Sequence, residues 1–569
     1  MPLMGSFYIG VSGLQTSQNS LNTTAHNVSN ADTTGYTRQQ ILTGTSVYNT
    51  LQSDTRAVAK QQIGLGVVYS KTRQVRDTFL DDTYRREVGR QGFYNISSDA
   101  LTEIEYLLDE MNGESFQESI NDLWVSVQEL AKDPASAVTQ GLFVERCSEF
   151  LARANSVYDG ISDYQKSLNV TVIDNVDRIN KIADSLKTLN DQIRNIECSG
   201  IEQANDLRDQ RNALLDELAG LANISYSEDL DNTVWVQLEG EDLVRGEIAY
   251  KMLTYEDPKT GFVTPFWEKN AKYGYDENHN KIFSQEEAKK AEVFDMSRVI
   301  SSDLNTDIGS LKSVLLARGD HKANFTDLLE ENYTNQVSQS VCMNIQSEFD
   351  QLVHNIATTI NNIISETAIA AKELNPSSTY LLDESGNPIQ IFQKIASDGY
   401  GASPVLTANA DGTYTYTVDY IAEDQDINET LYTVTNMQIN AKLLQQPTKL
   451  GFVTADGSVD YTTMEKIKDA FEAEDSTLNP NVKKKSSYID YYSDLVSQVA
   501  NSGYVYKSIL DSQDKTVGAT DSAREQIIGV SQDEELTMMI RFQNAYNASS
   551  RYINVVSEML EHIINTLGM

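Results

Sequence analysis

The chain carries an apolar stripe of helical spacing at each of its two ends. Each stripe steps alternately by four and three residues, and each has a single polar position, Gln18 or Ser549. The N-terminal seam consists of Phe7, Val11, Leu14, Leu21, Ala25 and Val28. The C-terminal seam consists of Met539, Phe542, Tyr546, Ile553, Val556, Leu560, Ile563 and Leu567. A repeat averaging 3.5 residues puts one stripe on one helix face, so we expect the terminal helices to pair as a coiled coil.

The composition limits the partners that such a chain can have. Its 569 residues exceed what one hydrophobic core usually organises, so several domains are expected. The net charge of −38 argues against nucleic acid and against anionic membranes, because both partners are themselves negative. An apolar content of 40% favours folded domains over general disorder.

The sequence shows neither the pattern of a membrane-targeting segment nor that of a disulfide framework. The N-terminal residues lack a basic segment followed by an apolar run, and no stretch of eighteen apolar residues occurs. We therefore expect no membrane span and no cleaved signal peptide. Cys147, Cys198 and Cys342 are odd in number and far apart, which predicts three buried free thiols and no disulfide framework.

Helical and strand-like segments alternate along the chain. Prolines are absent from residues 135–257 and 481–569, which suits long helices, whereas period-two segments such as Thr233–Leu238 predict strands. The predicted fold is multi-domain α plus β, a long helical bundle with inserted β-rich domains. Its expected parts are a terminal coiled-coil domain (1–70 with 525–569), disordered in the monomer, a helical bundle (71–222 with 325–374 and 485–524), a β-rich insertion (223–324) and a second, variable β-rich insertion (375–484).

Both ends resemble one protein family. Residues 12–39, SGLQTSQNSLNTTAHNVSNADTTGYTRQ, end in a polar turn marked by Asn30, Gly35 and Tyr36. This segment resembles the N-terminal signature of the bacterial flagellar axial proteins, with Asp32 in place of a usual Asn. The segment that begins GVSQDEELTMMIRFQNAYNASSRYINVV resembles the C-terminal signature of the same superfamily.

Internal segments narrow the resemblance to the hook-associated protein 1 family of hook–filament junction proteins. The segments that carry it are Glu129–Pro134, Asn205–Arg211 and Gly309–Arg318. The charges of Asn205–Arg211 could equally belong to a solvated helix face. The resemblance extends over roughly residues 4–250, 305–370 and 488–569, and it leaves 255–300 and 375–480 without an identified pattern.

The resemblance implies a structural protein of the bacterial flagellum that adapts the hook to the filament and is required for filament assembly. It implies self-assembly in a ring, contact with the hook protein and with the second junction protein (hook-associated protein 3), and an export chaperone bound to the C-terminal seam. An extracellular location, reached without a cleaved signal peptide, also follows from it. Two alternatives stay open: another axial protein of the hook or rod type, or an exported surface adhesin using its acidic β domains.

Catalytic and metal motifs find little support. The five histidines form no metal-binding pair, and no nucleophile-elbow or phosphate-loop pattern occurs, so neither an enzyme nor a cofactor is expected. Asp276, Asn278, Asn280 and Glu287 have the spacing of a calcium loop, but Lys281 stands where that loop needs glycine. A plain hairpin turn explains the same residues and is the favoured interpretation.

Overall fold

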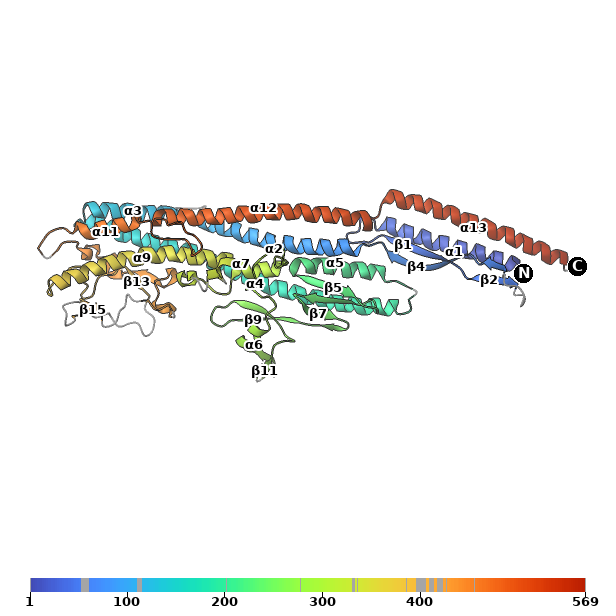
Figure 1. The fold of residues 1–569 in the computed structure, drawn as a ribbon, viewed down its shortest axis with the longest axis horizontal. Coiled ribbons are helices and arrows are strands. Elements are labelled where there is room, and N and C mark those ends of the chain that lie inside the picture. Colours follow the sequence, from blue (N-terminus) through green and yellow to red (C-terminus); the bar gives the residue numbers. More distant parts are fainter. Residues whose placement is uncertain are drawn as a thin grey trace.

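The molecule is long and narrow, with both chain termini at one end (Figure 1). The computed structural model describes residues 2–52, 61–109, 115–200, 202–276, 278–329, 333–334, 336–384, 386–395, 406–408, 414–416, 423–425, 427–454 and 456–567. Helices dominate, and the sheets are small and antiparallel. Within the described residues, no helix is long and apolar enough to cross a membrane.

The terminal layer consists of two long helices and a β-ribbon. Helix α1 (Pro2–Ser29) lies against α13 (Gln532–Leu567), so the predicted pairing of the terminal helices is confirmed. The paired strands β1 (Gln39–Thr45) and β4 (Val67–Gln74) also pack on α1, and β2 (Tyr48–Gln52) pairs with β3 (Gln61–Gly64) beyond them. The ribbon turns at Gly66, whose φ of +97° and close approach to Ser12 both exclude a side chain.

The body is a bundle built along two antiparallel helices, α2 and α12. Its helices share one large core, in which the apolar positions of the longest helix, α4, are buried from Phe143 to Ile193. The bundle helices are α2 (Thr78–Asp109), α3 (Phe116–Lys132), α4 (Ala137–Glu197), α5 (Asn205–Leu221), α7 (Ser310–Arg318), α9 (Val341–Leu374) and α12 (Tyr488–Ile528). Cys147 and Cys342 are buried in it, whereas Cys198 is exposed just beyond α4, so the prediction of three buried thiols is wrong for Cys198.

The first insertion is β-rich and packs on α4. A four-stranded sheet is followed by two hairpins and a short helix, α6 (Gln285–Lys290). Its strands are β5 (Ile224–Glu228), β6 (Val234–Leu238), β7 (Glu241–Arg245), β8 (Ile248–Ala249), β9 (Met252–Glu256), β10 (Val263–Trp267), β11 (Tyr273–Tyr275) and β12 (Lys281–Phe283). The expected end at residue 324 lies past the sheet, because α7 packs with the bundle helices. The 3-10 helix η1 (Phe325–Leu328) follows and packs on α9.

The second insertion contains less strand than its sequence pattern suggests. Its described strands are three residues long: β13 (Phe392–Lys394), β14 (Leu406–Ala408), β15 (Tyr414–Tyr416) and β16 (Met437–Ile439). The other described elements of this insertion are helices: η3 (Asn428–Thr430), η4 (Val434–Asn436), α10 (Ala441–Gln445), η5 (Pro447–Leu450) and α11 (Tyr461–Glu472). A separate 3-10 helix, η2 (Val337–Gln339), lies just before α9. Apolar residues such as Phe452 and Phe471 join the bundle core, so packing on helices replaces a larger sheet.

Candidate assembly site

The two terminal helices approach each other closely through glycines of α1. A Cβ atom on Gly10 would lie 2.6 Å from Cγ1 of Ile553, and one on Gly13 would lie 2.8 Å from Oγ of Ser549. Farther along, Asn27 bonds to Glu535. From one of these contacts to the next, the residue number rises on α1 and falls on α13. The two helices are therefore antiparallel. A bulkier residue at Gly10 would push the helices apart.

The buried face of α1 is not the apolar seam. Gly10, Ser17, Ser20, Thr24 and Asn27 are buried there. Among the N-terminal seam residues Phe7 is 36% exposed, Ala25 is exposed, and Val11, Leu14, Leu21 and Val28 are half-buried. The sequence reasoning missed this stripe of small residues, although with Gly13 it also steps by three and four. Its spacing was the signal, but its members are too small or too polar to count as an apolar repeat.

The C-terminal seam lies on the side of α13 that is less exposed. Val556 is buried, and Met539, Phe542, Tyr546, Ser549, Ile553 and Leu560 are half-buried. Ile563 is exposed near the tip, and the side chain of Leu567 falls outside the described residues. Large residues of α13 therefore face small residues of α1, which lets the helices pack closely.

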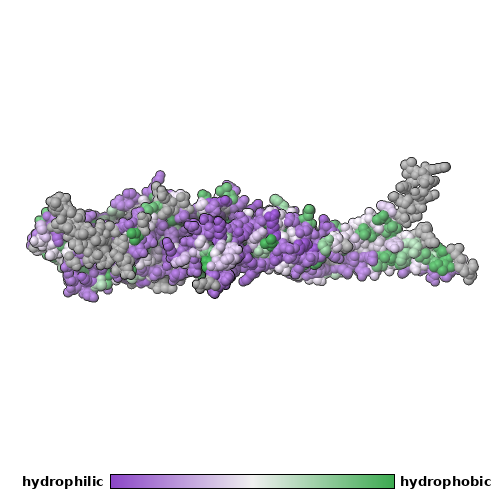
Figure 2. Space-filling model, turned by 90° about the horizontal axis from the view of Figure 1, so that it is seen from below, coloured by the Kyte–Doolittle hydropathy of each residue, from purple (hydrophilic) through white to green (hydrophobic). Residues whose placement is uncertain are grey.

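A second set of apolar side chains on α13 stays exposed beside this contact. Ile540 and Ile564, for example, are 61% and 68% exposed. The exposed members are Leu536, Ile540, Val555, Met559 and Ile564. In Figure 2 hydrophobic surface gathers toward the end of the molecule that the terminal helices form. Exposed apolar side chains that gather at one end of a molecule suggest a binding surface.

The turn after α1 binds the first turns of α13. Glu535 accepts a hydrogen bond from Nε of Arg38 at 2.8 Å and another from Nδ2 of Asn27 at 3.0 Å. Oδ1 of Asn27 accepts from the hydroxyl of Tyr36 at 2.8 Å and from the backbone N–H of Gln39. Burial, together with nearby carboxylates, raises the pKa of Tyr36, which keeps its hydroxyl a donor.

The other marker residues of the turn have different roles. Gly35 has a φ of +79°, a backbone conformation that favours glycine. Asn30 lies just beyond the end of α1, and its Nδ2 donates to the carbonyl of His26 at 3.0 Å. The motif therefore ends one helix and turns the chain toward the ribbon.

Helix α5 meets the same turn through the charged segment 205–211. Asp209 accepts from the backbone N–H of Thr37 at 3.1 Å and from Nε2 of Gln74 at 2.7 Å. Burial raises the pKa of Asp209 to about 6, although the N–H and hydroxyl of Thr37 act in the opposite direction. Arg208 pairs with Glu197 at 2.7 Å. Because its charges hold other elements, the interpretation of this segment as a solvated helix face is wrong.

A buried ion-pair network lies where α2, α5 and α12 meet. Asp216 pairs with Arg85 at 2.6 Å and with Arg524 at 2.6 Å. Asp81 pairs with Arg524 at 2.9 Å and with Arg76 at 2.8 Å. These contacts fix the end of α12, from which the chain continues to α13.

The candidate calcium loop is a hairpin turn between β11 and β12. The Asp276 carboxylate accepts from the backbone N–H groups of Asn278 and Asn280, at 2.8 and 2.7 Å. Glu287 instead accepts from the backbone of Lys272 and pairs with Lys290. Local hydrogen bonds thus account for these side chains, and the described part of the chain holds no cluster of three or more metal-ligating residues of the His, Cys, Asp or Glu type.

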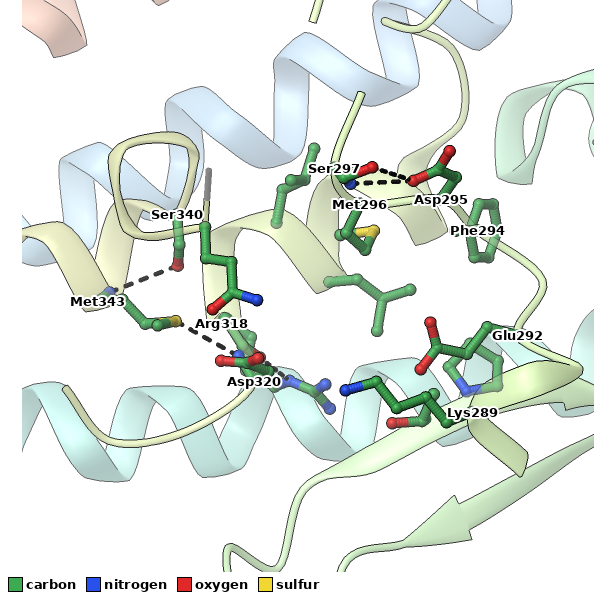
Figure 3. Close-up of a pocket in the computed structure, with 16 residues that line it drawn as sticks. Lys289, Glu292, Phe294, Asp295, Met296, Ser297, Arg318, Asp320, Ser340 and Met343 are labelled. Atoms are coloured by element: carbon green, nitrogen blue, oxygen red, sulfur yellow. Dashed lines mark hydrogen bonds between the residues drawn. The ribbon is translucent and has the colours of Figure 1, made fainter. Parts of the chain in front are cut away.

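A cavity of about 340 Å³ lies where the first insertion meets α7 and α9 (Figure 3). Asp295 in its wall accepts from Ser297, and Arg318 donates to the carbonyls of Gly319 and Val263. Its described lining contains neither His nor Cys, the usual general base and a common nucleophile. The polar groups of the cavity wall hold the insertion on the bundle.

Comparison with known proteins places the chain among flagellar proteins. Residues 101–373 match the model for the flagellar hook-associated protein FlgK helical domain. Residues 7–37 match the flagella basal body rod protein model, and residues 527–566 match the flagellar basal body rod FlgEFG protein C-terminal model. Flagellar hook-associated protein 1 of Bacillus subtilis is 24% identical, with 98% of this chain and 97% of that protein covered. The chain belongs to the flagellar hook-associated protein 1 family.

Other comparisons agree with this family. Flagellar hook-associated protein 1 of Escherichia coli is 21% identical, with 98% of each chain covered, and that of Salmonella typhimurium is 23% identical, also with 98% of each covered. The structure titled as the flagellar hook junction protein FlgK from Burkholderia pseudomallei shares the fold with a TM-score of 0.51 at 12% identity. That match covers 80% of this chain and all of the other.

Family membership decides between the alternatives left open by the sequence. The chain is a structural protein of the flagellar hook–filament junction and not an enzyme. A hook or rod protein and a surface adhesin are not favoured, because both the helical-domain model and the full-length relatives belong to the hook-associated family.

Proposed function

We propose that the terminal helices are the surface through which this hook-associated protein 1 family member assembles. The observation that carries the proposal is the second apolar stripe of α13, which stays exposed although the seam side faces α1. Exposed apolar side chains on a helix already packed on one side suit a second helical partner. We assign that place to copies of the same chain in a ring.

Assembly supplies the burial that the terminal pair lacks by itself. Burying a large apolar side chain contributes roughly 1.5–3 kcal/mol, whereas ordering the backbone costs about 1–2 kcal/mol per residue. In a lone pair of helices, most seam residues are only half-buried, so the two terms nearly cancel. We infer that the termini are loose in the monomer and become ordered as a coiled coil when neighbouring subunits cover them.

The further partners follow from the position of the family at the junction. The ring would contact the hook protein on one side and the second junction protein, hook-associated protein 3, on the other. Before assembly, an export chaperone would cover the C-terminal seam, since an exposed apolar helix needs a temporary partner. The working location is extracellular, on the flagellum, reached by export without a cleaved signal peptide.

A charge placed in the seam tests the proposal. Leu560→Glu puts a carboxylate on the half-buried side of α13, and it should block filament formation while the bundle stays folded by circular dichroism. Ser557→Glu, at an exposed position one turn earlier, is the matched control and should assemble. Normal filaments on cells that carry Leu560→Glu would show that the seam side of α13 is not needed for assembly. Met559→Glu places the charge in the exposed stripe itself, and normal filaments with this variant would show that the stripe is not the assembly surface.

A further inference from the structure

Both terminal helices leave the body at one joint. The backbone N–H of Arg38, between the turn after α1 and strand β1, donates to the carbonyl of Ile528 at 2.8 Å, and Ile528 is the last residue of α12. The free ends of α1 and α13 lie together at the opposite end of the pair (Figure 1). Chain connectivity keeps the two helices close only at the joint, so the first contacts between them cost least entropy there.

Glu535 is the α13 carboxylate placed to make that first contact. It is 3% exposed, whereas the side chain of its neighbour Glu534 is 65% exposed. Burying a carboxylate is unfavourable unless donors replace its water. Arg38 and Asn27 supply those donors from the turn and from the last residues of α1.

We propose that Glu535 is the residue that selects α1 as the partner of α13 and sets their register, with pairing spreading from this contact to the free ends. The small-residue face of α1 permits several sliding positions, because its glycines and serines recur at regular spacing. One buried polar contact can fix the register of a helix pair, because any shifted pairing leaves the charge without donors. The inference rests on the proposed function, since it describes how the assembling helices find each other.

Trapping the register as a disulfide tests the inference. A Cβ on Gly13 would lie 3.7 Å from Cβ of Ser549, inside the range of about 3.5–4.5 Å that disulfides require. The full-length chain would carry Gly13→Cys and Ser549→Cys. A third substitution, Cys198→Ser, would remove the exposed native thiol, which could otherwise compete. The rate of disulfide formation then measures how often the helices meet in register, about 21 Å along α13 from Glu535.

Four versions of this reporter separate selection from general helix stability. Glu535→Gln and Arg38→Met should each slow disulfide formation about tenfold, because a hydrogen bond to a charged group is lost. The double variant should be no slower than either single variant, since both changes remove the same contact. Glu534→Gln keeps the buried pair but removes a charge that favours the start of α13 and that also lies 3.6 Å from Arg38. Because that longer pair is exposed, the variant should stay within about twofold of the parent.

Two outcomes would overturn the inference. One is equal rates for Glu535→Gln and Glu534→Gln, which would reduce Glu535 to a general effect on the helix N-terminus. The other is a double variant whose slowing is the product of the two single effects. Filament assembly is measured separately with Leu560→Glu, so failure of the assembly proposal and failure of the register inference give different results.

Discussion

Ile553 occupies the space in which Gly10 has no side chain. A Cβ on Gly10 would stand 2.6 Å from Cγ1 of Ile553, below any normal contact distance. We therefore predict that Gly10→Ala separates α1 from α13 and costs about 1–3 kcal/mol of pairing free energy. Limited proteolysis should then cut residues 2–29 and 532–567 faster than in the parent protein.

The control for that substitution lies one and a half turns earlier on the same helix. No atom lies within 4 Å of a Cβ built on Gly5. Gly5→Ala should therefore gain about 0.5–1 kcal/mol of helix propensity and slow the cleavage or leave it unchanged. Equal acceleration by both alanine variants would contradict the close approach at Gly10.

Asp216 is predicted to hold the end of α12 on the bundle. It pairs with Arg85 and Arg524, whose side chains are 4% and 9% exposed. Asp216→Asn should destabilise the protein by about 2–4 kcal/mol, because it leaves two buried guanidinium groups short of a partner. Urea unfolding measures the change. Glu217→Gln is the matched control: its pair with Arg178 is largely exposed, and such pairs contribute about 0–1 kcal/mol.

Glu348 is predicted to make the stability of the bundle depend on pH. The carboxylate is fully buried and accepts from Gln498 and Asn479, and burial raises its pKa to about 7. A carboxyl group whose pKa is raised on folding binds more protons in the folded state between its unfolded and folded pKa values. The stability that Glu348 contributes is therefore complete below its unfolded-state pKa of about 4.3. That stability is lost as the pH rises through its folded-state pKa of about 7.

Urea unfolding between about pH 5 and about pH 8 measures this dependence. Stability should fall with rising pH in the parent, and the fall should be smaller in Glu348→Gln, which cannot titrate. Glu366→Gln, at an exposed position of the same helix α9, should keep the pH profile of the parent. Identical profiles for the parent and Glu348→Gln would rule out Glu348 as the source.

The charge of the chain predicts salt-dependent assembly. Copies that each carry a net charge of −38 repel one another in a ring. Raising NaCl from about 0.05 M to about 0.3 M screens charges beyond several ångströms and should speed self-assembly, followed by light scattering. An equally osmotic sucrose solution controls for general effects of solute. Slower assembly at the higher salt would mean that attraction between charges dominates the interface.

Local sequence determined much of this protein. The spacing of apolar residues placed the helices, from the terminal stripes to the buried positions of α4, because a helix face is set by residues three and four apart. Alternation at Thr233–Leu238 likewise predicted β6 (Val234–Leu238), and the signatures at both ends indicated the family. These properties depend on neighbours in the chain, so they are readable without the fold.

Only the tertiary structure decided which faces meet. Periodicity shows that Phe7 and Leu14 share a face of α1, but Gly10 and Gly13 are the residues that lie against α13, because small residues allow closer helix packing than large ones. The charges at Asp209 looked like a solvated surface until Thr37 and Gln74 were seen to bond to it from distant parts of the chain. The burial of a residue and its choice of partner depend on residues hundreds of positions away in the chain, as with Asn27 and Glu535. No local sequence pattern contains that information.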